Sequence, residues 1–216
     1  MSEDSINESS MTENKARLFV IAAPSGAGKT TIVRKLLARN PELHFSISYT
    51  TRKRRRTEVD GADYLFVDVA EFTRLRESGE LLEYARVFDN WYATSRKQVE
   101  QHLAEGHSVI LEIDWQGARQ VRESMPACVT IFVLPPSLQE LERRLRDRLT
   151  DDAEVIERRL ADARGDMSHW DEFHYIIIND DLEKAVEDLN DVILGQGHAS
   201  AATDKHVSLA VTEIIS

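Results

Sequence analysis

A glycine-rich segment near the start of the chain restricts the possible folds more than any other feature. Residues 23–30 read Ala-Pro-Ser-Gly-Ala-Gly-Lys-Thr, after an apolar run at 18–22 and before a helical pattern that ends at Asn40-Pro41. A glycine-rich turn between a buried strand and a helix directs backbone N–H groups at a polyphosphate, and the helix N-terminus adds partial positive charge. The segment departs from the usual phosphate-loop pattern only at Ala23, where glycine is expected.

The chemistry of a phosphate loop gives roles to its last residues. We expect Lys29 to reach the β- and γ-phosphates of ATP and the hydroxyl of Thr30 to bind Mg²⁺. The alternative is an ordinary glycine-rich turn that caps a helix, but the strand before it and the helix after it favour the phosphate loop. The ATP-binding residues predicted in this segment are Ala23, Pro24, Ser25, Gly26, Ala27, Gly28, Lys29, Thr30 and Thr31.

Apolar runs and helical patterns alternate along most of the chain. The pattern predicts strands at 18–22, 108–113, 130–134 and 175–178, and helices at 96–105, 137–148, 152–167 and 182–194. Such alternation predicts an α/β fold with a parallel central sheet flanked by helices. Residues 45–95 break the rhythm, with strands expected at 45–50, 64–67 and 81–87 and a helix at 71–78. We interpret this segment as a small mixed insert that carries the substrate site.

Composition and charge exclude several classes of protein. With 42% hydrophobic residues the chain can form a packed core, and its formal net charge of −11 argues against a nucleic-acid partner. Residues 1–16 are polar, which predicts a flexible tail and no signal peptide, and no apolar run is long enough for a membrane span. The single cysteine, Cys128, predicts a reducing, cytoplasmic location. The seven histidines show no metal-ligand spacing, so the sequence assigns them no chemistry.

A second group of motifs resembles the signature of guanylate kinases. It consists of Ser48-Tyr49-Thr50-Thr51-Arg52 with Arg55, Glu58, Gly61 and Tyr64, then Glu83, Asn90-Trp91-Tyr92-Ala93-Thr94-Ser95, Ile113-Asp114-Trp115-Gln116-Gly117, Pro135-Pro136-Ser137 and Asn179-Asp180-Asp181-Leu182. These motifs stand in order, at matching spacings, over about residues 17–190. The resemblance implies a P-loop nucleoside monophosphate kinase fold with a GMP-binding insert and a helical lid.

The resemblance also implies a domain layout. A flexible tail at 1–16 would precede a kinase-like domain at 17–194, with its core at 17–44 and 96–194, its GMP-binding insert at about 45–95 and its lid at about 140–165. Residues 195–216 match no motif and form an extension of unknown structure. The implied partners are the small molecules ATP and GMP, with no nucleic acid and no membrane, and the oligomeric state stays open.

The resemblance further implies roles for single residues. The acceptor site would consist of Ser48, Arg52, Arg55, Glu58, Tyr64, Glu83, Tyr92, Thr94 and Asp114. On the ATP side, Arg144, Arg148 and Arg159 would approach the phosphates and Asn179 the adenine, and the catalytic residues would be Lys29, Arg52, Arg148 and Arg159. The implied reaction is direct in-line transfer of the γ-phosphoryl group of ATP to GMP, and to dGMP, with Mg²⁺, in purine nucleotide metabolism and GMP recycling.

The chemistry of the acceptor fits these residue types. A monophosphate dianion suits two guanidinium forks and two phenol donors. Guanine presents N1–H and N2–H₂ on one edge, and the single carboxylate of Glu83 can accept both. Adenine would place a lone pair against that carboxylate. Hydroxyls on Ser48 and Thr94 can donate to O6 of guanine.

Each assignment has a structural alternative. In isolation, the basic run at 52–56 fits a solvated patch better, and Glu83 fits the wet face of a half-exposed strand equally well. Tyr64 and Tyr92 are also typical packing aromatics, and the lid arginines also suit ion pairs along one helix. The sequence spacing between the basic run and Tyr64 and Glu83 nevertheless favours the assignment of these residues to the acceptor site.

Two rival functions belong to other classes. A scaffold domain that binds phosphorylated peptides would tend to lose the phosphate loop, yet residues 28–30 are intact. A sugar-phosphate kinase would not need the base-reading set of Ser48, Glu83 and Thr94. The chain departs from the family pattern at Arg54, Arg56, Ala93, Glu112 and Leu149. These departures leave open whether Glu112 reaches Mg²⁺ or GMP and how Leu149 affects the lid hinge.

Overall fold

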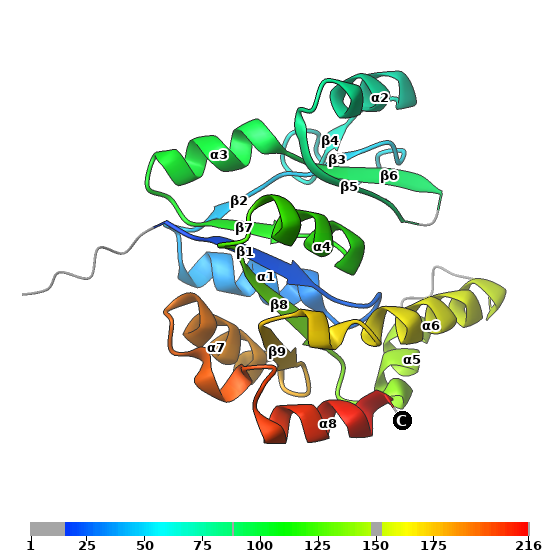
Figure 1. Cartoon of the computed structure of the whole chain (residues 1–216). Coiled ribbons are helices and arrows are strands. Elements are labelled where there is room, and N and C mark those ends of the chain that lie inside the picture. The colour runs from blue at the N-terminus through cyan, green and yellow to red at the C-terminus, as the bar shows by residue number, and fades with distance from the viewer. Residues whose placement is uncertain (1–15, 88, 148–152, 216) are drawn as a thin grey trace, which may run out of the picture.

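A five-stranded parallel sheet forms the centre of the computed structural model, which describes residues 16–87, 89–147 and 153–215 (Figure 1). The strand order is β2-β7-β1-β8-β9, and every neighbouring pair is parallel. The strands are β1 (Leu18–Ala22), β2 (His44–Phe45), β7 (Val109–Glu112), β8 (Val129–Leu134) and β9 (Tyr175–Ile178). The predicted parallel α/β sheet is therefore confirmed, whereas the predicted N-terminal tail lies outside the described residues apart from Ala16.

Successive residues of each strand face opposite helical layers, as the period of two in a strand requires. Phe19 and Ile21 of β1 pack against α1 (Lys29–Arg39) and α7 (Leu182–Ile193). Leu18 and Val20 pack in the opposite layer. The helices of that layer are α3 (Arg96–Ala104), α4 (Trp115–Ser124), α5 (Leu138–Arg146), α6 (Ala153–Met167) and α8 (Lys205–Ile215).

A second, four-stranded sheet lies above the main sheet in Figure 1, in the order β4-β3-β6-β5. Its pairs are mixed, since β3 runs parallel to β4 and antiparallel to β6, and β6 runs antiparallel to β5. A separate small core forms between this sheet and its helix, where Phe72 stacks on Trp91 with ring centroids 5.6 Å apart. The elements are β3 (Tyr49–Thr50), β4 (Leu65–Phe66), α2 (Val69–Glu77), β5 (Leu81–Val87) and β6 (Asn90–Ser95).

The single strand expected at 45–50 is wrong. Its first part is β2, which pairs with β7 in the main sheet, and its last part is β3, which pairs with β4 and β6 in the small sheet. Residues 46–48 therefore carry the chain from one sheet to the other. A continuous apolar pattern cannot reveal this crossing, because both parts are strand by composition.

The starts of the predicted helices agree with the structure, but several helices and strands were not predicted. Helices α3 and α5 begin at Arg96 and Leu138, close to the predicted starts at 96 and 137, and their caps Ser95 and Ser137 accept from the backbone N–H of Gln98 and Glu140 at 3.3 and 3.1 Å. However, β6, α4 and α8 were not predicted, and α5 ends at Arg146 and not at 148. The extension after 194, left unassigned from the sequence, contains a 3-10 turn and α8, whose residues Val211 and Ile214 are buried.

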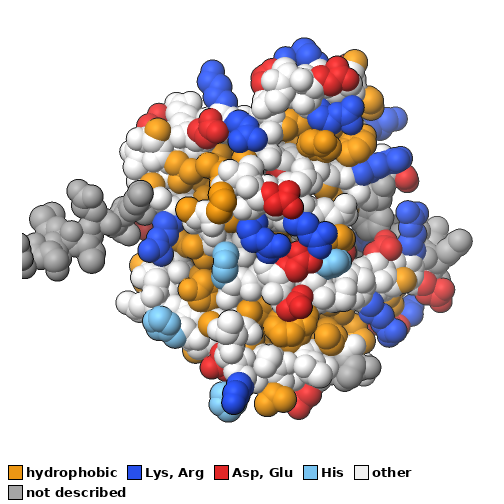
Figure 2. Space-filling model, in the orientation of Figure 1, with side chains coloured by type: hydrophobic (Ala, Val, Ile, Leu, Met, Phe, Trp, Pro, Cys, Tyr) orange, Lys and Arg blue, Asp and Glu red, His pale blue; other side chains and the backbone are white. Residues whose placement is uncertain are grey.

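The histidine expectation also needs correction. Three of the seven, His44, His102 and His107, form one cluster although they are far apart in sequence. Cys128 is a buried free thiol, and burial raises its pKa. None of the helices in the described ranges has both the length and the apolar composition needed to cross a bilayer. On the face in Figure 2, basic side chains lie interspersed with acidic ones.

Candidate active site

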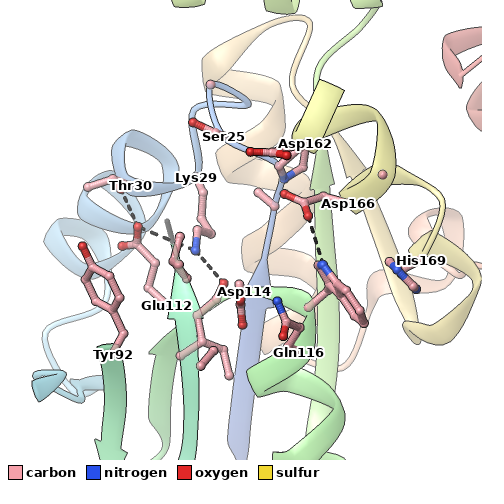
Figure 3. A pocket seen from close by; sticks show the side chains of 18 of the residues that line it. Ser25, Lys29, Thr30, Tyr92, Glu112, Asp114, Gln116, Asp162, Asp166 and His169 are labelled. Atoms are coloured by element: carbon pink, nitrogen blue, oxygen red, sulfur yellow. Dashed lines mark hydrogen bonds and ion pairs between the residues drawn. The ribbon is translucent and has the colours of Figure 1, made fainter. Parts of the chain in front are cut away.

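A cavity of about 850 Å³ opens between the carboxyl ends of β1 and β7, the small sheet and α6 (Figure 3). It brings together residues that the sequence assigned to the donor side and residues that it assigned to the acceptor side. The predicted residues that line it are Ala23, Pro24, Ser25, Gly26, Gly28, Lys29, Thr30, Thr31, Ser48, Tyr64, Glu83, Tyr92 and Asp114.

The phosphate loop connects β1 to α1 and contains two residues with left-handed backbone. Gly26 and Gly28 both have a φ of 92°, a conformation that side chains with a Cβ rarely adopt. A Cβ on Gly28 would lie 2.4 Å from Nδ2 of Asn179, so space as well as backbone requires glycine there. The neighbouring Ala27 is fully buried and accepts a hydrogen bond from the same amide at 2.7 Å. Ala23, the departure from the motif, still begins the loop directly after β1.

Lys29 and Thr30 meet the end of β7. The Lys29 ammonium donates to the carbonyl of Ile113 at 2.7 Å and lies 4.0 Å from the Glu112 carboxylate, and the Thr30 hydroxyl donates to Glu112 (Figure 3). Burial lowers the pKa of Lys29, while the nearby carboxylates of Glu112 and Asp114 oppose this shift. A hydroxyl and a carboxylate side by side supply the hard oxygen ligands that Mg²⁺ prefers.

Glu83 reaches the cavity because β5 is irregular there. The pairing shifts between Leu81 and Glu83, so Leu81, Leu82 and Glu83 are all buried in succession. The carboxylate is 3% exposed and accepts from the Thr94 hydroxyl at 2.7 Å. Burial raises the pKa of Glu83 to about 8, the Thr94 hydrogen bond opposing the shift and Asp114 adding to it. The half-exposed strand face considered from the sequence is therefore wrong for this residue.

The space for Glu83 depends on a glycine in α4. A Cβ on Gly117 would lie 2.5 Å from Oε2 of Glu83 and 3.3 Å from Oδ1 of Asp114. Asp114 itself is the N-cap of α4, and its carboxylate accepts from the Gly117 N–H at 2.8 Å. Burial raises the pKa of Asp114 as well. Asp114 thus lines the cavity while it holds the start of the helix.

The basic run carries an ion pair beside the two tyrosines. Arg52 binds Glu58 through two contacts, at 2.7 and 3.1 Å, and its guanidinium lies 5.3 Å from the centroid of the Tyr64 ring. Glu58 also accepts from the backbone N–H of Arg55 at 2.8 Å, and the Arg52 hydrogen bond lowers the pKa of Glu58. The centroids of Tyr64 and Tyr92 lie 5.9 Å apart. Arg52, Arg55 and Glu58 therefore lie next to the cavity wall formed by the tyrosines, but are not part of its lining.

The predicted residues of the ATP side that lie on α5 and after β9 contact the phosphate loop from behind. Arg144 pairs with Glu140 at 2.7 Å and donates to the carbonyl of Asn179 at 3.0 Å and to that of Ala27 at 3.4 Å. This pairing matches the ion-pair alternative considered for the lid arginines. Arg159 lies on α6 and is not among the described residues that line the cavity, whereas the adjacent Arg158 is. The predicted catalytic Arg148, like Leu149, lies outside the described residues.

Sequence reasoning missed one wall of the cavity, which α6 and the residues after it form. Asp162, Asp166 and His169 line it together with Trp115, whose indole N–H donates to Asp166 at 3.0 Å and whose ring stacks on His169 at 3.6 Å (Figure 3). Burial raises the pKa of Asp166 to about 6. Asp162 and Asp166 stand four residues apart in the predicted helix at 152–167, a spacing that places them on one face and was the available signal, whereas His169 lies beyond that helix.

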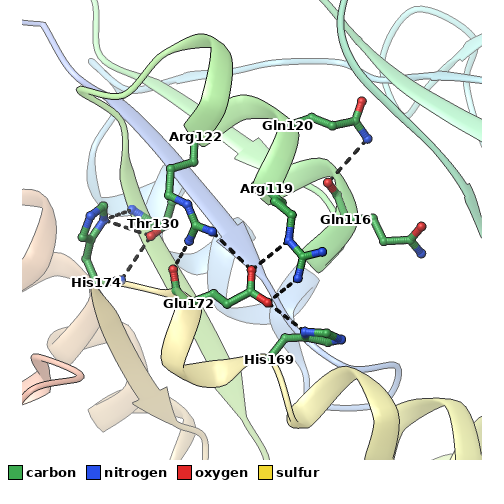
Figure 4. A network of polar contacts seen from close by, with 8 residues as sticks. All are labelled: Gln116, Arg119, Gln120, Arg122, Thr130, His169, Glu172 and His174. Atoms are coloured by element: carbon green, nitrogen blue, oxygen red, sulfur yellow. Dashed lines mark hydrogen bonds and ion pairs between the residues drawn. The ribbon is translucent and has the colours of Figure 1, made fainter.

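A charged network supports this wall from outside (Figure 4). Glu172 accepts from Arg119 at 3.0 Å, from Arg122 at 3.2 Å and from the His169 ring at 2.8 Å. These contacts lower the pKa of Glu172 to about 2, with the Arg119 hydrogen bond as the largest cause. Next to it, the ring of His174 binds Thr130 at 2.9 Å. The network joins α4 to the segment that carries His169 and so fixes the position of the imidazole against Trp115.

Known proteins match this chain over most of its length. The guanylate kinase family model matches residues 15–196. A guanylate kinase of Aromatoleum aromaticum is 56% identical over 176 residues, which cover 82% of this chain and 86% of that protein. A guanylate kinase of Methylococcus capsulatus is 54% identical over 179 residues, covering 83% and 88%.

A solved structure agrees with these relatives. The crystal structure of guanylate kinase from Anaplasma phagocytophilum superposes with a TM-score of 0.71 at 36% identity, covering 85% of this chain and 87% of that one. The family expected from the motifs is confirmed: the chain belongs to the guanylate kinase family.

Proposed function

We propose that the cavity at the carboxyl ends of β1 and β7 carries the phosphoryl transfer of this enzyme. As a guanylate kinase, the chain is an ATP:GMP phosphotransferase. The observation that carries the proposal is the shared cavity, lined by the phosphate loop on one side and by Ser48, Glu83 and the two tyrosines on the other. A donor and an acceptor nucleotide bound there would have their phosphates close together, which is what direct transfer needs.

On the donor side, the backbone N–H groups of the loop would surround the polyphosphate of ATP and Lys29 would contact its β- and γ-phosphates. Mg²⁺ would be held by Thr30 and by Glu112, which the sequence left open and which lies against both Thr30 and Lys29. When bound, the ion would neutralise charge on the transferring phosphoryl group. Asn179 and Arg144 would support the loop from behind, so that its N–H groups keep their direction.

On the acceptor side, Arg52, Arg55, Tyr64 and Tyr92 would hold the phosphate of GMP. Glu58 would contribute by orienting the two arginines, since it binds the guanidinium of Arg52 and the backbone of Arg55. Glu83 would accept from the guanine edge, with Thr94 and Asp114 fixing the carboxylate and helix around it. Ser48 would contact the base from the crossing segment at 46–48. None of these proposed contacts involves a ribose hydroxyl, so we also expect dGMP to be an acceptor.

The transfer step needs positive charge that moves into place. The GMP phosphate oxygen would attack the γ-phosphorus in line, without a covalent enzyme intermediate, while Lys29 and Arg52 stabilise the spreading negative charge. Arg148 and Arg159 would help to stabilise this negative charge when the lid at about 140–165 closes and excludes water. The domain layout belongs to the proposal too: core at 17–44 and 96–194, insert at about 45–95, and tails at 1–16 and 195–216.

The cellular role follows from the reaction. We place it in purine nucleotide metabolism and GMP recycling in the cytoplasm, where the free thiol of Cys128 would stay reduced. The partners would be small nucleotides and not nucleic acid, in line with the mixed charges on the face in Figure 2 and the net charge of −11.

A coupled ADP-release assay tests the proposal. ATP is supplied with GMP, dGMP, AMP, CMP or UMP in turn. We expect turnover with GMP and dGMP, and a kcat/KM roughly 10⁴–10⁵ lower with AMP, because a site built on hydrogen bonds rejects an acceptor that cannot form them. Comparable turnover with AMP, or ADP release that needs no acceptor, would contradict the proposed base-reading site.

A further inference from the structure

The cluster of His44, His102 and His107 lies far from the phosphate loop. His44 begins β2 and pairs with Val109, the first residue of β7, so the cluster sits at the amino edge of the parallel sheet. The nucleotide cavity opens at the carboxyl edge, where Glu112 ends β7. Glu112 follows His107 by five positions, four of them in β7, which corresponds to about 16 Å of extended chain. The cluster is therefore separate from the proposed active site.

Local structure holds the three rings together. His102 lies in the last turn of α3, and Gly106, with a φ of 85°, turns the chain so that the backbone N–H of His107 donates to the carbonyl of His102 at 2.9 Å. The ring of His44 lies between the other two, with centroids 4.3 Å from His102 and 4.2 Å from His107. The Glu105 carboxylate lies 3.7 Å from Nδ1 of both His102 and His107.

Two ring nitrogens in the cluster are buried and have no hydrogen-bond partner among the residues that the structure describes. They are Nδ1 of His102 and Nδ1 of His107. Imidazole nitrogens that lose water without gaining a partner are costly, and such groups in a folded protein often mark the position of an ion. One ligand atom from each of the three histidines lies within 4.8 Å of the others.

These atoms can converge on an ion after small side-chain rotations. Zinc binds imidazole at about 2.0–2.1 Å, so nitrogens around a tetrahedral ion lie about 3.3–3.4 Å apart. The present spacing of up to 4.8 Å is open by little more than an ångström, which rotation of exposed rings can close; the side chains of His102 and His107 are 33% and 44% exposed. The same exposure gives the ion a path from solvent.

We propose that His44, His102 and His107 bind one divalent transition-metal ion, with Glu105 as the fourth ligand. Imidazole ligands favour zinc and its neighbours over the oxygen-seeking Mg²⁺ of the nucleotide site. The ion would join two segments that connect the main sheet to the small one. His44 precedes the crossing at 46–48, and α3 directly follows β6. Metal binding would thus tie both connections of the acceptor insert together at their base.

Tag-free, chelator-treated protein of full length tests this site in the absence of nucleotide. Zn²⁺ is titrated by calorimetry, and Co²⁺ is used as a visible probe of tetrahedral nitrogen ligands. We expect one Zn²⁺ per chain and a rise in Tm of about 5–10 °C at a free Zn²⁺ concentration roughly one hundred times Kd. Hydrogen exchange in residues 44–48 and 100–108 should slow on binding, a readout that does not involve kinase activity.

Single variants separate the site from adventitious binding. His44→Gln and His107→Gln should each weaken Zn²⁺ binding by at least about tenfold, because even the loss of a partner of a ligand typically costs about 10–100-fold. His206→Gln, which changes an exposed histidine of α8 outside the cluster, is the matched control and should bind as the wild type does. Circular dichroism checks that each variant folds. Absence of stoichiometric binding to the wild type, or equal affinity in the folded cluster variants and the control, would refute the site.

Discussion

Replacing Glu83 by glutamine should change acceptor choice and leave ATP binding intact. The substitution keeps the shape and the contact with Thr94, but replaces one acceptor oxygen with an NH₂ group that would face a guanine N–H. Since the buried site then leaves polar groups of the base unpaired, we expect kcat/KM for GMP to fall severely and the GMP-over-AMP ratio, roughly 10⁴–10⁵ in the wild type, to shrink. Affinity for a non-hydrolysable ATP analogue is the control, because the phosphate loop is unchanged.

The pH dependence gives a second, quantitative test of the same residue. With a pKa of about 8, Glu83 is largely protonated in the free enzyme at pH 7, whereas the guanine edge needs the carboxylate. Below that pKa the competent fraction falls about tenfold for each pH unit, so kcat/KM for GMP should rise about tenfold from pH 6 to 7 and level off above pH 8. The ratio of GMP to AMP isolates this effect, because both acceptors share the titration of their phosphate and of Lys29.

Stability should move in the opposite direction. The folded-state pKa of Glu83 is raised from 4.5 to about 8, so its contribution is fully present below the unfolded value and is lost as pH rises through the folded one. The loss corresponds to roughly 5 kcal/mol at most. Glu83→Gln, which cannot ionise, should therefore unfold at a higher temperature than the wild type at pH 8.5, by about 2–4 °C for each kcal/mol gained, with the difference shrinking toward pH 5.

Paired measurements of activity and stability decide the matter. kcat/KM for GMP and AMP is measured from pH 6 to 9 in both proteins, and Tm is recorded over the same range. If the folded glutamine variant keeps the GMP preference, Glu83 does not read the base. If the wild-type ratio is flat with pH, the carboxylate does not titrate as its burial requires.

Three further predictions address other parts of the cavity. Lys29→Ala should fold normally and lose on the order of 10²–10³ in kcat, and near wild-type turnover would refute the role of the phosphate loop. Hydrogen exchange over residues 140–165 should slow when an ATP analogue and GMP bind together, and unchanged exchange would argue against a closing lid. Gly117→Ala should lower kcat/KM for GMP because its Cβ would lie 2.5 Å from the Glu83 carboxylate. Gly165→Ala is the control for stability, since no atom of the described residues lies within 4 Å of the added Cβ, and it should raise Tm through helix propensity; because Gly165 lines the cavity, the two variants are compared by Tm and not by activity.

The parts of the fold that the sequence predicted are those with dense local signals. The parallel sheet was predicted from apolar runs, and α3 and α5, which Ser95 and Ser137 cap, were predicted from continuous helical patterns. Helix α4 was missed because its buried face is only Gly117, Ala118 and Val121, too small for a visible apolar stripe. Sequence patterns therefore reveal a helix when its own residues form a clear apolar stripe, and they miss a helix such as α4 when its buried residues are small.

The candidate site shows the same division. Residues of the phosphate loop could be predicted because one continuous segment holds them. The wall of Asp162, Asp166 and His169, and the histidine cluster, join residues from separate elements, and only the packing of those elements brings them together. The burial of Glu83 belongs to this second kind, since it depends on a pairing shift in β5 and on the missing Cβ of Gly117.

Acidic side chains surround Lys29 in the cavity, so we expect two bound phosphorylated ligands to need further positive charge nearby. Lys29 faces the carboxyl groups of Glu112, Asp114, Asp166 and Glu83, an acidic surrounding for two phosphorylated ligands. Each carboxyl group has another partner: Glu112 accepts from Thr30, Asp114 caps α4, Asp166 accepts from Trp115, and Glu83 accepts from Thr94. In the proposed reaction, Mg²⁺, Arg158 in the cavity wall, Arg52 and Arg55 beside it, and the lid arginines after closure would balance the phosphate charge. The proposed site would therefore transfer the phosphoryl group efficiently only when both nucleotides are bound and the closed lid excludes water.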